Sequence, residues 1–203
     1  MILHWSPKSP FVRKVMIAAH ELELVDQITL VRSVAAMSAP NPQIMADNPL
    51  SKIPTLVLDD GAAIYDSSVI CAYLNDLADG PLLPRNGRER WTALTREALA
   101  DGLLDVLILW RNEREKPEAA QSPAWTKAFA LKIERGLERL ESDADALSQT
   151  PFSVGHIAVG SLLSYLDFRF GTLNWRANCP GLSIWHSNFS VRPSVVATEI
   201  KND

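Results

Sequence analysis

The chain has 203 residues, a length that suits one large domain or two small ones. Hydrophobic residues make up 47% and charged residues 22%, which is ordinary for a soluble globular protein, and a net charge of −4 argues against nucleic-acid binding. No apolar stretch reaches the roughly 18 residues of a membrane span. Cys71 and Cys179 lie far apart, which argues against a disulfide framework or a zinc site. Without the features of a signal peptide, we expect a cytoplasmic protein.

Strand and helix patterns alternate over the first 78 residues. The pair Asp60-Gly61 separates two short apolar runs and predicts a β-hairpin. Residues 38–48 are interrupted by prolines and allow at most a short helix. In chain order we expect a strand in residues 1–5, a helix in 10–22, a strand in 25–33, the short helix, two strands in 55–60 and 62–66, and a helix in 67–78.

Glycine and proline cluster in residues 79–88, which predicts a linker between two domains. The pattern after the linker is helical, so an all-helical domain is expected over residues 89–203. The segment 153–170 is apolar on most faces and is typical of a buried helix. The other helices are expected over 88–115 and 122–147, with two short ones near 179–189 and 192–198.

Three short motifs could carry chemistry. Ile53-Pro54 stands just before a strand, where a cis proline would leave the Ile53 N–H and C=O free to pair with an extended peptide; a plain loop end is the alternative. Asp66 and Ser67 open a helix, where an acid beside an anion site suits the two ends of an amino acid. An ordinary helix cap explains that pair equally well.

Ser9 stands at another strand-to-helix turn, in the segment SPKSPFVRKV of residues 6–15. A serine followed by a proline is typical of a helix cap. The same hydroxyl, at the positive end of the helix dipole, could instead donate to a thiolate and lower the pKa of a thiol that belongs to a substrate. Ser6 is the second candidate for this role. Hydrolysis by serine is disfavoured because no GxSxG motif is present.

These motifs together resemble the glutathione S-transferases, over nearly the whole chain. The segments that carry the resemblance are SPKSPFVRKV, NPLSKIPTLVLDDGAAIYDSSVICAYL and the weaker RPS near the C-terminus. The segments SPFVRKV and EALADGLLD are most similar to a bacterial branch called YibF-like. The resemblance implies an α/β N-terminal thioredoxin-like domain in residues 1–78 and an all-α C-terminal helical domain. It also implies a homodimer.

Carried over position by position, the resemblance assigns a role to each motif. Ser9 would stabilise the glutathione thiolate, and Asp66 with Ser67 would hold the γ-glutamyl end. Ile53, before a cis Pro54, would pair with the cysteinyl backbone, and Lys52 would reach the glycine carboxylate. Because a hydroxyl cannot be thiolated, mixed-disulfide chemistry is not expected.

A second substrate would bind between the two domains, by the same resemblance. It would be a small apolar electrophile. The candidate residues by helical spacing are Asp101, Asp105, Leu109 and Arg111, with Trp5 beside the Ser9 loop. A solvated or subunit-facing surface for the two acids, and a core position for Trp5, are the alternatives. The four histidines show no metal-ligand spacing, so no metal is expected.

One position departs from the family pattern. The buried helix of this family normally opens with Ser/Thr-x-x-Asp, whereas residues 153–156 read SVGH. His156 can replace the acid as an acceptor only if its ring is neutral and suitably turned. Gly155 also weakens a first turn. We therefore expect a loss of about 1 kcal/mol of stability relative to aspartate.

The sequence as a whole predicts a glutathione-dependent transferase of the detoxification type. Glutathione would be its co-substrate, without a metal, a nucleic acid or a membrane as partner. The alternatives are a glutathione-fold binding or regulatory protein with little catalysis, and a peroxidase or isomerase activity at the same site.

Overall fold

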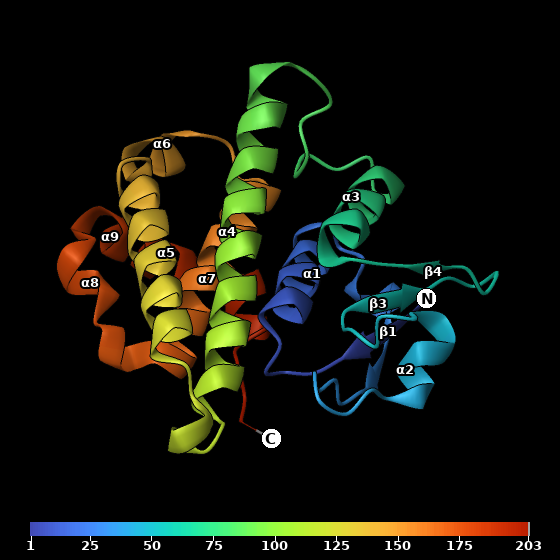
Figure 1. Cartoon of the computed structure of the whole chain (residues 1–203). Helices are drawn as coiled ribbons and strands as arrows, with labels where there is room; N and C mark the ends of the chain where they lie inside the picture. Colours follow the sequence, from blue (N-terminus) through green and yellow to red (C-terminus); the bar gives the residue numbers. More distant parts are fainter. Residues whose placement is uncertain (203) are drawn as a thin grey trace. The chain divides into compact units, whose positions relative to one another are not determined.

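The computed structural model describes residues 1–202 and divides the chain into two compact units (Figure 1). Unit 1 contains Met1–Arg90 together with the C-terminal segment that begins at Arg192. Unit 2 contains Trp91–Val191. The four strands all belong to unit 1, and unit 2 is built from helices, in the part of the chain described. This architecture confirms the α/β N-terminal and helical C-terminal fold class.

The sheet of unit 1 has the strand order β2-β1-β3-β4. The central strand β1 (Ile2–Trp5) pairs in parallel with β2 (Thr29–Arg32) and antiparallel with β3 (Thr55–Val57), and β4 (Ala63–Ile64) pairs antiparallel with β3. The turn at Asp60-Gly61 joins β3 to β4, which confirms the predicted hairpin. Strand β2 starts later than expected, because the 3₁₀ helix η1 (Val25–Gln27) precedes it.

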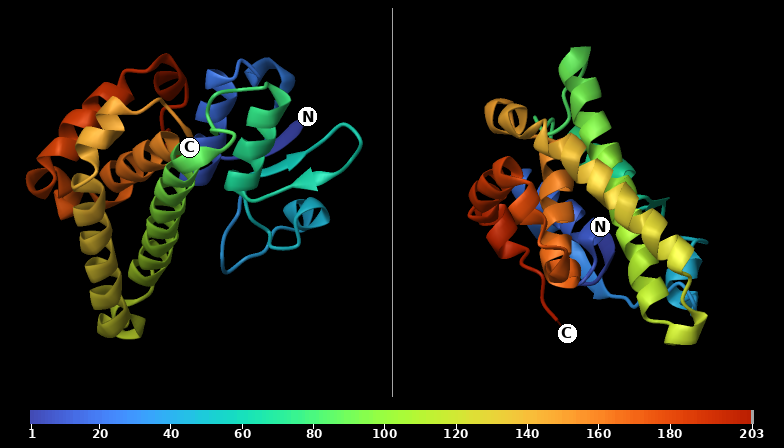
Figure 2. Two further views of the ribbon diagram at one scale, coloured as in Figure 1. Left: turned by 90° about the horizontal axis from the view of Figure 1, so that it is seen from above. Right: turned by 60° about the vertical axis from the view of Figure 1, so that its left-hand side comes forward.

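Helices cover the two faces of this sheet. Helices α1 (Pro10–Glu21) and α3 (Ser67–Leu77) pack together on one face, and the short α2 (Pro42–Asp47) lies on the other (Figures 1 and 2). Side chains alternate between the faces along a strand. The fully buried Leu3 and Leu56 are cross-strand partners, and the next pair, His4 and Thr55, points to the opposite face. The face towards α2 is therefore polar at its centre.

Unit 2 is organised around α7 (Val154–Phe170), which is buried over most of its length, as predicted. Gly160 permits this packing, because a Cβ at that position would lie 2.1 Å from the Phe189 ring. Helices α4 and α5 form an antiparallel pair (Figure 2). The helices around α7 are α4 (Gly87–Arg114), α5 (Pro123–Glu141), α6 (Ala144–Gln149), α8 (Trp175–Asn178) and α9 (Pro180–Ser190), with short 3₁₀ turns at Glu118–Ala120 and Gly171–Leu173.

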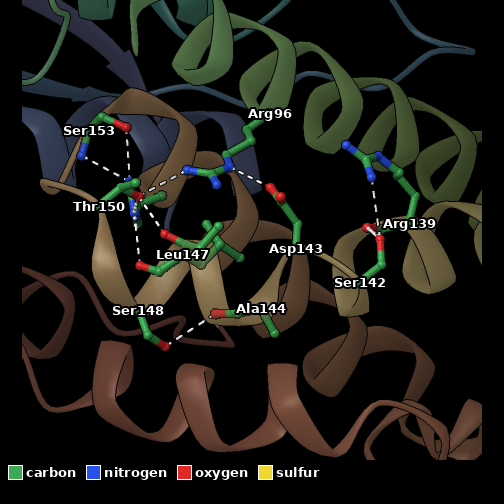
Figure 3. A network of polar contacts seen from close by, with 11 residues as sticks. Arg96, Arg139, Ser142, Asp143, Ala144, Leu147, Ser148, Thr150 and Ser153 are labelled. Atoms are coloured by element: carbon green, nitrogen blue, oxygen red, sulfur yellow. Dashed lines mark hydrogen bonds and ion pairs between the residues drawn. The ribbon is translucent and has the colours of Figure 1, made fainter.

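The single helix predicted over residues 122–147 is wrong, because the chain breaks it into α5 and α6. Asp143 lies at the break, and its carboxylate accepts a hydrogen bond of 2.7 Å from Nε of the buried Arg96 (Figure 3). The same guanidinium donates to Thr150 at 3.1 Å. A buried arginine requires such partners, so this long-range ion pair favours a turn at Asp143. The short helix α8 was also not predicted.

His156 fulfils the condition that the sequence left open. The backbone N–H of Ser153 donates to its Nδ1 at 3.1 Å, and its Nε2 lies 3.1 Å from the Leu147 carbonyl oxygen. A carbonyl only accepts, so Nε2 carries the hydrogen and Nδ1 accepts, which is the neutral ring. Ser153 and His156 thus form a capping box, and Gly155 allows the Ala93 backbone to approach closely. The reason for expecting a weaker cap at this position is therefore removed, and the effect of His156 on stability stays a prediction.

We predict that His156→Asp lowers the free energy of unfolding by about 2 kcal/mol or more. An aspartate carboxylate has no hydrogen to donate to the Leu147 carbonyl, and the change removes a ring that packs against Phe152 and Trp185. The thermal midpoint should fall by about 4–8 °C. His156→Gln, whose amide reaches further, should lose less. A midpoint for His156→Asp at or above the wild-type value would contradict this assignment.

The C-terminal segment is fastened to α1 of unit 1. Arg192 donates two hydrogen bonds to the Glu21 carboxylate, at 3.2 and 2.8 Å, and Ser194 at the start of α10 (Pro193–Ala197) donates a third. Arg13 of α1 also donates to the Val195 carbonyl at 3.4 Å. Burial alone would raise the pKa of Glu21, but the hydrogen bonds from Arg192 and Ser194 outweigh it and hold the pKa below its ordinary value.

A lowered carboxyl pKa stabilises the fold above the pKa of the unfolded chain, about 4.3, and this stability is lost as pH falls through the folded value. We predict that Glu21→Gln costs about 1–2 kcal/mol at pH 7. The difference from wild type should shrink below about pH 4. Denaturant titrations at both pH values measure it, with Asp76→Asn on the exposed side of α3 as the control. Equal stabilities of wild type and Glu21→Gln at pH 7 would refute the role of this contact.

Candidate functional site

The strand directions bring the three sequence motifs to one end of the sheet. Strands β1 and β4 both run antiparallel to β3, so they end where β3 begins. Ser9 follows β1, and Asp66 follows β4. Ile53-Pro54 precedes β3 at the same end. Ser9, Ile53 and Asp66, which are far apart in the sequence, therefore lie at the same end of the unit 1 sheet.

Ser9 caps helix α1. Its backbone is extended, with φ −83° and ψ 121°, and its Oγ accepts a hydrogen bond of 3.3 Å from the Val12 N–H. A hydroxyl that accepts one hydrogen bond through a lone pair keeps its own hydrogen available for donation. Capping of α1 and donation to a ligand are therefore compatible. Ser9 is half-buried at the positive end of the α1 dipole.

Ser6, the second candidate, is engaged in the turn that leads to Ser9. The residue is only 8% exposed, and its Oγ accepts from the Lys8 N–H at 3.4 Å. Its carbonyl accepts from the Ser9 N–H at 3.2 Å. These contacts give Ser6 a role in shaping the turn and leave Ser9 as the more accessible hydroxyl.

The Ile53-Pro54 peptide bond is cis, as expected. No hydrogen bond within residues 1–202 uses the backbone N–H or C=O of the half-buried Ile53, which leaves both groups available to an extended peptide. The preceding carbonyl, of Lys52, accepts from Thr55 Oγ1 at 2.8 Å. The side chain of Lys52 is exposed. The Lys52 backbone is therefore fixed by a hydrogen bond to a side chain, although it lies outside the sheet.

Asp66 and Ser67 begin helix α3. The exposed Asp66 caps the helix, because its Oδ1 accepts from the Ser68 N–H at 3.0 Å. Ser67 is almost fully buried. The Lys14 side chain, completely buried on α1, donates to Ser68 Oγ at 3.2 Å and brings an amino group to the start of α3. The sequence reasoning missed Lys14 because it lies in a stretch that reads as a core helix face.

The residues suggested for a second substrate are divided between the units. Trp5 ends β1 in unit 1, whereas Asp101, Asp105, Leu109 and Arg111 lie on α4 in unit 2. Leu109 is exposed, at 45%. Arg111 makes an ion pair of 3.4 Å with Glu115, one turn along the same helix. Their part in a shared pocket stays a prediction.

Among residues 1–202, no helix is both long and apolar enough to cross a membrane. Within the same residues, no group of three histidine, cysteine or acidic side chains is placed to hold a metal ion. The groups that the three motifs bring to the end of the sheet are hydroxyls, a carboxylate and backbone N–H and C=O.

Comparisons with known proteins identify the family and the fold. Residues 8–77 match the family model of the glutathione S-transferase N-terminal domain. The chain is 31% identical to the uncharacterized GST-like protein YibF of Escherichia coli, over 98% of each chain. A glutathione transferase family member from Pseudomonas fluorescens, solved with bound glutathione, is 40% identical with a TM-score of 0.96 over 99% of each chain.

A second structure of a family member from the same organism contains S-(propanoic acid)-glutathione. It is 38% identical to this chain, with a TM-score of 0.91 over the full length of both chains. The identity to YibF along nearly the whole length, together with the N-terminal family model, decides the family. The chain belongs to the glutathione S-transferase family.

Proposed function

We propose that this protein binds glutathione at the end of the unit 1 sheet and conjugates it to a small apolar electrophile. The single observation that carries the proposal is the geometry of Ser9, whose hydroxyl caps α1 and still has a hydrogen to donate. The relatives that hold glutathione and a glutathione substituted at sulfur support the choice of ligand.

Each part of the tripeptide has a suitable partner. The Asp66 carboxylate would accept from the γ-glutamyl ammonium, and Ser67 with the start of α3 would bind the neighbouring carboxylate. The unpaired Ile53 N–H and C=O would pair with the cysteinyl backbone as an added strand. Lys52 would attract the glycine carboxylate. These contacts would place the thiol near Ser9.

Ser9 would act by stabilising the thiolate. A charge-assisted hydrogen bond contributes about 1.5–3 kcal/mol, and the α1 dipole about 0.3–1 kcal/mol. Because one pKa unit corresponds to about 1.36 kcal/mol, the thiol pKa would fall from about 8.5 to roughly 6–7. The thiolate would then be a large fraction of bound glutathione at neutral pH.

In the reaction, the thiolate sulfur attacks an electrophilic carbon. A carbon–sulfur bond forms. Either the bond from that carbon to a leaving group breaks and the leaving group takes the electron pair, or the π pair of an activated double bond moves onto the adjacent atom, which is then protonated. The protein forms no covalent bond. Catalysis would come from the lowered thiol pKa and from proximity. The electrophile would bind to residues of α4, with Leu109 as the apolar candidate and Asp101, Asp105 and Arg111 as the polar ones. The protein would act as a cytoplasmic homodimer that serves detoxification.

A binding or regulatory protein with little turnover is the second candidate, because the cap alone accounts for a serine at position 9. A peroxidase or isomerase activity would use the same thiolate with a different acceptor. Assays with an aryl halide, a Michael acceptor, an organic hydroperoxide and an isomerisable substrate separate these functions. Turnover near background for all four would favour the binding protein.

We predict that Ser9→Gly lowers kcat/KM for conjugation by roughly 10–100-fold at pH 6.5, because the thiolate fraction falls with the loss of the hydroxyl. The loss should nearly disappear at pH 9, where the thiol ionises unaided. Glycine serves well as a helix cap, so the fold should lose only a few tenths of a kcal/mol.

Two controls sharpen this experiment. Ser9→Thr keeps the hydroxyl and should keep most of the activity at pH 6.5. Ser6→Ala alters the turn without removing the proposed donor, and its pH profile should match wild type. A Ser9→Gly enzyme with the wild-type pH profile would rule out activation by Ser9.

A further inference from the structure

A buried polar cluster lies between the centre of the sheet and helix α2. His4 of β1 is 7% exposed, and its Nδ1 lies 2.8 Å from Ser33 Oγ, just beyond β2. Its Nε2 lies 2.9 Å from Oδ2 of Asp47, the last residue of α2. Local sequence spacing gives His4 no partner, because both of its contacts come from distant segments. The structure shows that it ties three separate segments together.

The residue types are those of a hydrolytic triad, but the hydrogen bonds exclude that use. Ser33 Oγ donates to the Val31 carbonyl at 3.1 Å, so its hydrogen points away from His4. Ser33 is also only 5% exposed. A serine whose hydrogen is held by a carbonyl is not poised to lose it to the histidine as a nucleophile must.

The neighbouring pair continues the cluster towards the glutathione motifs. Thr55 is the cross-strand partner of His4, so the two side chains share the face of the sheet that α2 covers. Thr55 Oγ1 accepts from Asn48 Nδ2 at 2.9 Å. His4 and Thr55 thus anchor Asp47 and Asn48, two consecutive residues, to adjacent points of the sheet.

Asn48 then holds the loop that carries the candidate ligands. Its Oδ1 accepts from the Leu50 N–H at 3.0 Å, and its carbonyl accepts from the Ser51 N–H at 2.9 Å. Asn48 Nδ2 also lies 3.4 Å from the Lys52 carbonyl, which Thr55 Oγ1 holds at 2.8 Å. His4 is thus linked to the Lys52-Ile53 backbone in sequence. His4 contacts Asp47, Asp47 is followed by Asn48, and the Asn48 side chain contacts the Lys52 carbonyl, which precedes Ile53.

We propose that the His4–Asp47 pair is a positioning contact that fixes α2 and the Lys52-Ile53 segment in the conformation that binds the peptide part of glutathione. This inference rests on the proposed function of that segment. Neither residue would touch the reacting sulfur. The pair would act on glutathione affinity, because an unfastened loop must be ordered when the ligand binds.

Asp47 is the better residue to change, because its side chain is 32% exposed whereas His4 lies inside. We expect Asp47→Ala to weaken glutathione binding by about 10-fold in calorimetry, the loss that corresponds to one charge-assisted contact. Asp47→Asn keeps an acceptor oxygen for Nε2 and should recover most of the affinity. Asp76→Ala removes an exposed acid from the end of α3 in the same unit and serves as the matched control.

Two readouts distinguish positioning from a general loss of structure. Asp47→Ala should raise KM for glutathione about 10-fold and leave kcat at saturation within about 2-fold, whereas partial unfolding would lower kcat. S-methylglutathione has no ionisable thiol, and its affinity should fall as much as that of glutathione. Ser9→Gly should leave S-methylglutathione affinity unchanged.

The possible failures are separable. If wild type binds glutathione and Asp47→Ala binds it as tightly as Asp76→Ala does, the positioning contact is refuted while the glutathione site stands. A fall in kcat at unchanged KM would refute it as well. If wild type binds neither glutathione nor S-methylglutathione, the proposed function fails and this inference fails with it.

Discussion

The antiparallel pairing of β3 with both β1 and β4 is the constraint on which the candidate site depends. It places the ends of β1 and β4 beside the start of β3. The starts of α1 and α3 therefore lie at the same end of the sheet, each with the positive end of its dipole. The unpaired backbone of Ile53 lies there too. In the proposed complex, the amino acid end of glutathione meets the start of α3, its cysteinyl backbone meets Ile53, and its thiol meets the start of α1. None of the three motifs would suffice alone, since each is also an ordinary cap or turn.

The two faces of the sheet serve different purposes in this account. The face beneath α1 and α3 is apolar, with Leu3 and Leu56 fully buried, and it stabilises the unit by burial. The face beneath α2 holds His4 and Thr55, whose hydrogen bonds are directional and fix where the following loop lies. Along β1 and β3, one residue of each pair thus stabilises the unit by burial, and the next residue fixes the position of the loop before β3.

Much of this structure could be predicted from local patterns. The strands, the hairpin at Asp60-Gly61, the buried helix α7 and the cis Ile53-Pro54 bond follow from short segments whose physical preferences are strong. The break between α5 and α6 could not, because it depends on an ion pair between Arg96 and Asp143, far apart in the sequence. His4 was missed for the same reason: its partners, Ser33 and Asp47, come from other elements.

The most direct test of the account is the absorbance of the thiolate of bound glutathione as a function of pH, in wild type and in Ser9→Gly. The account predicts a thiol pKa of roughly 6–7 in wild type and a value returned towards about 8.5 in the variant. Bound glutathione with the same unshifted pKa in both proteins would contradict it, and would leave Ser9 as the cap of α1 in a protein that binds glutathione without activating it.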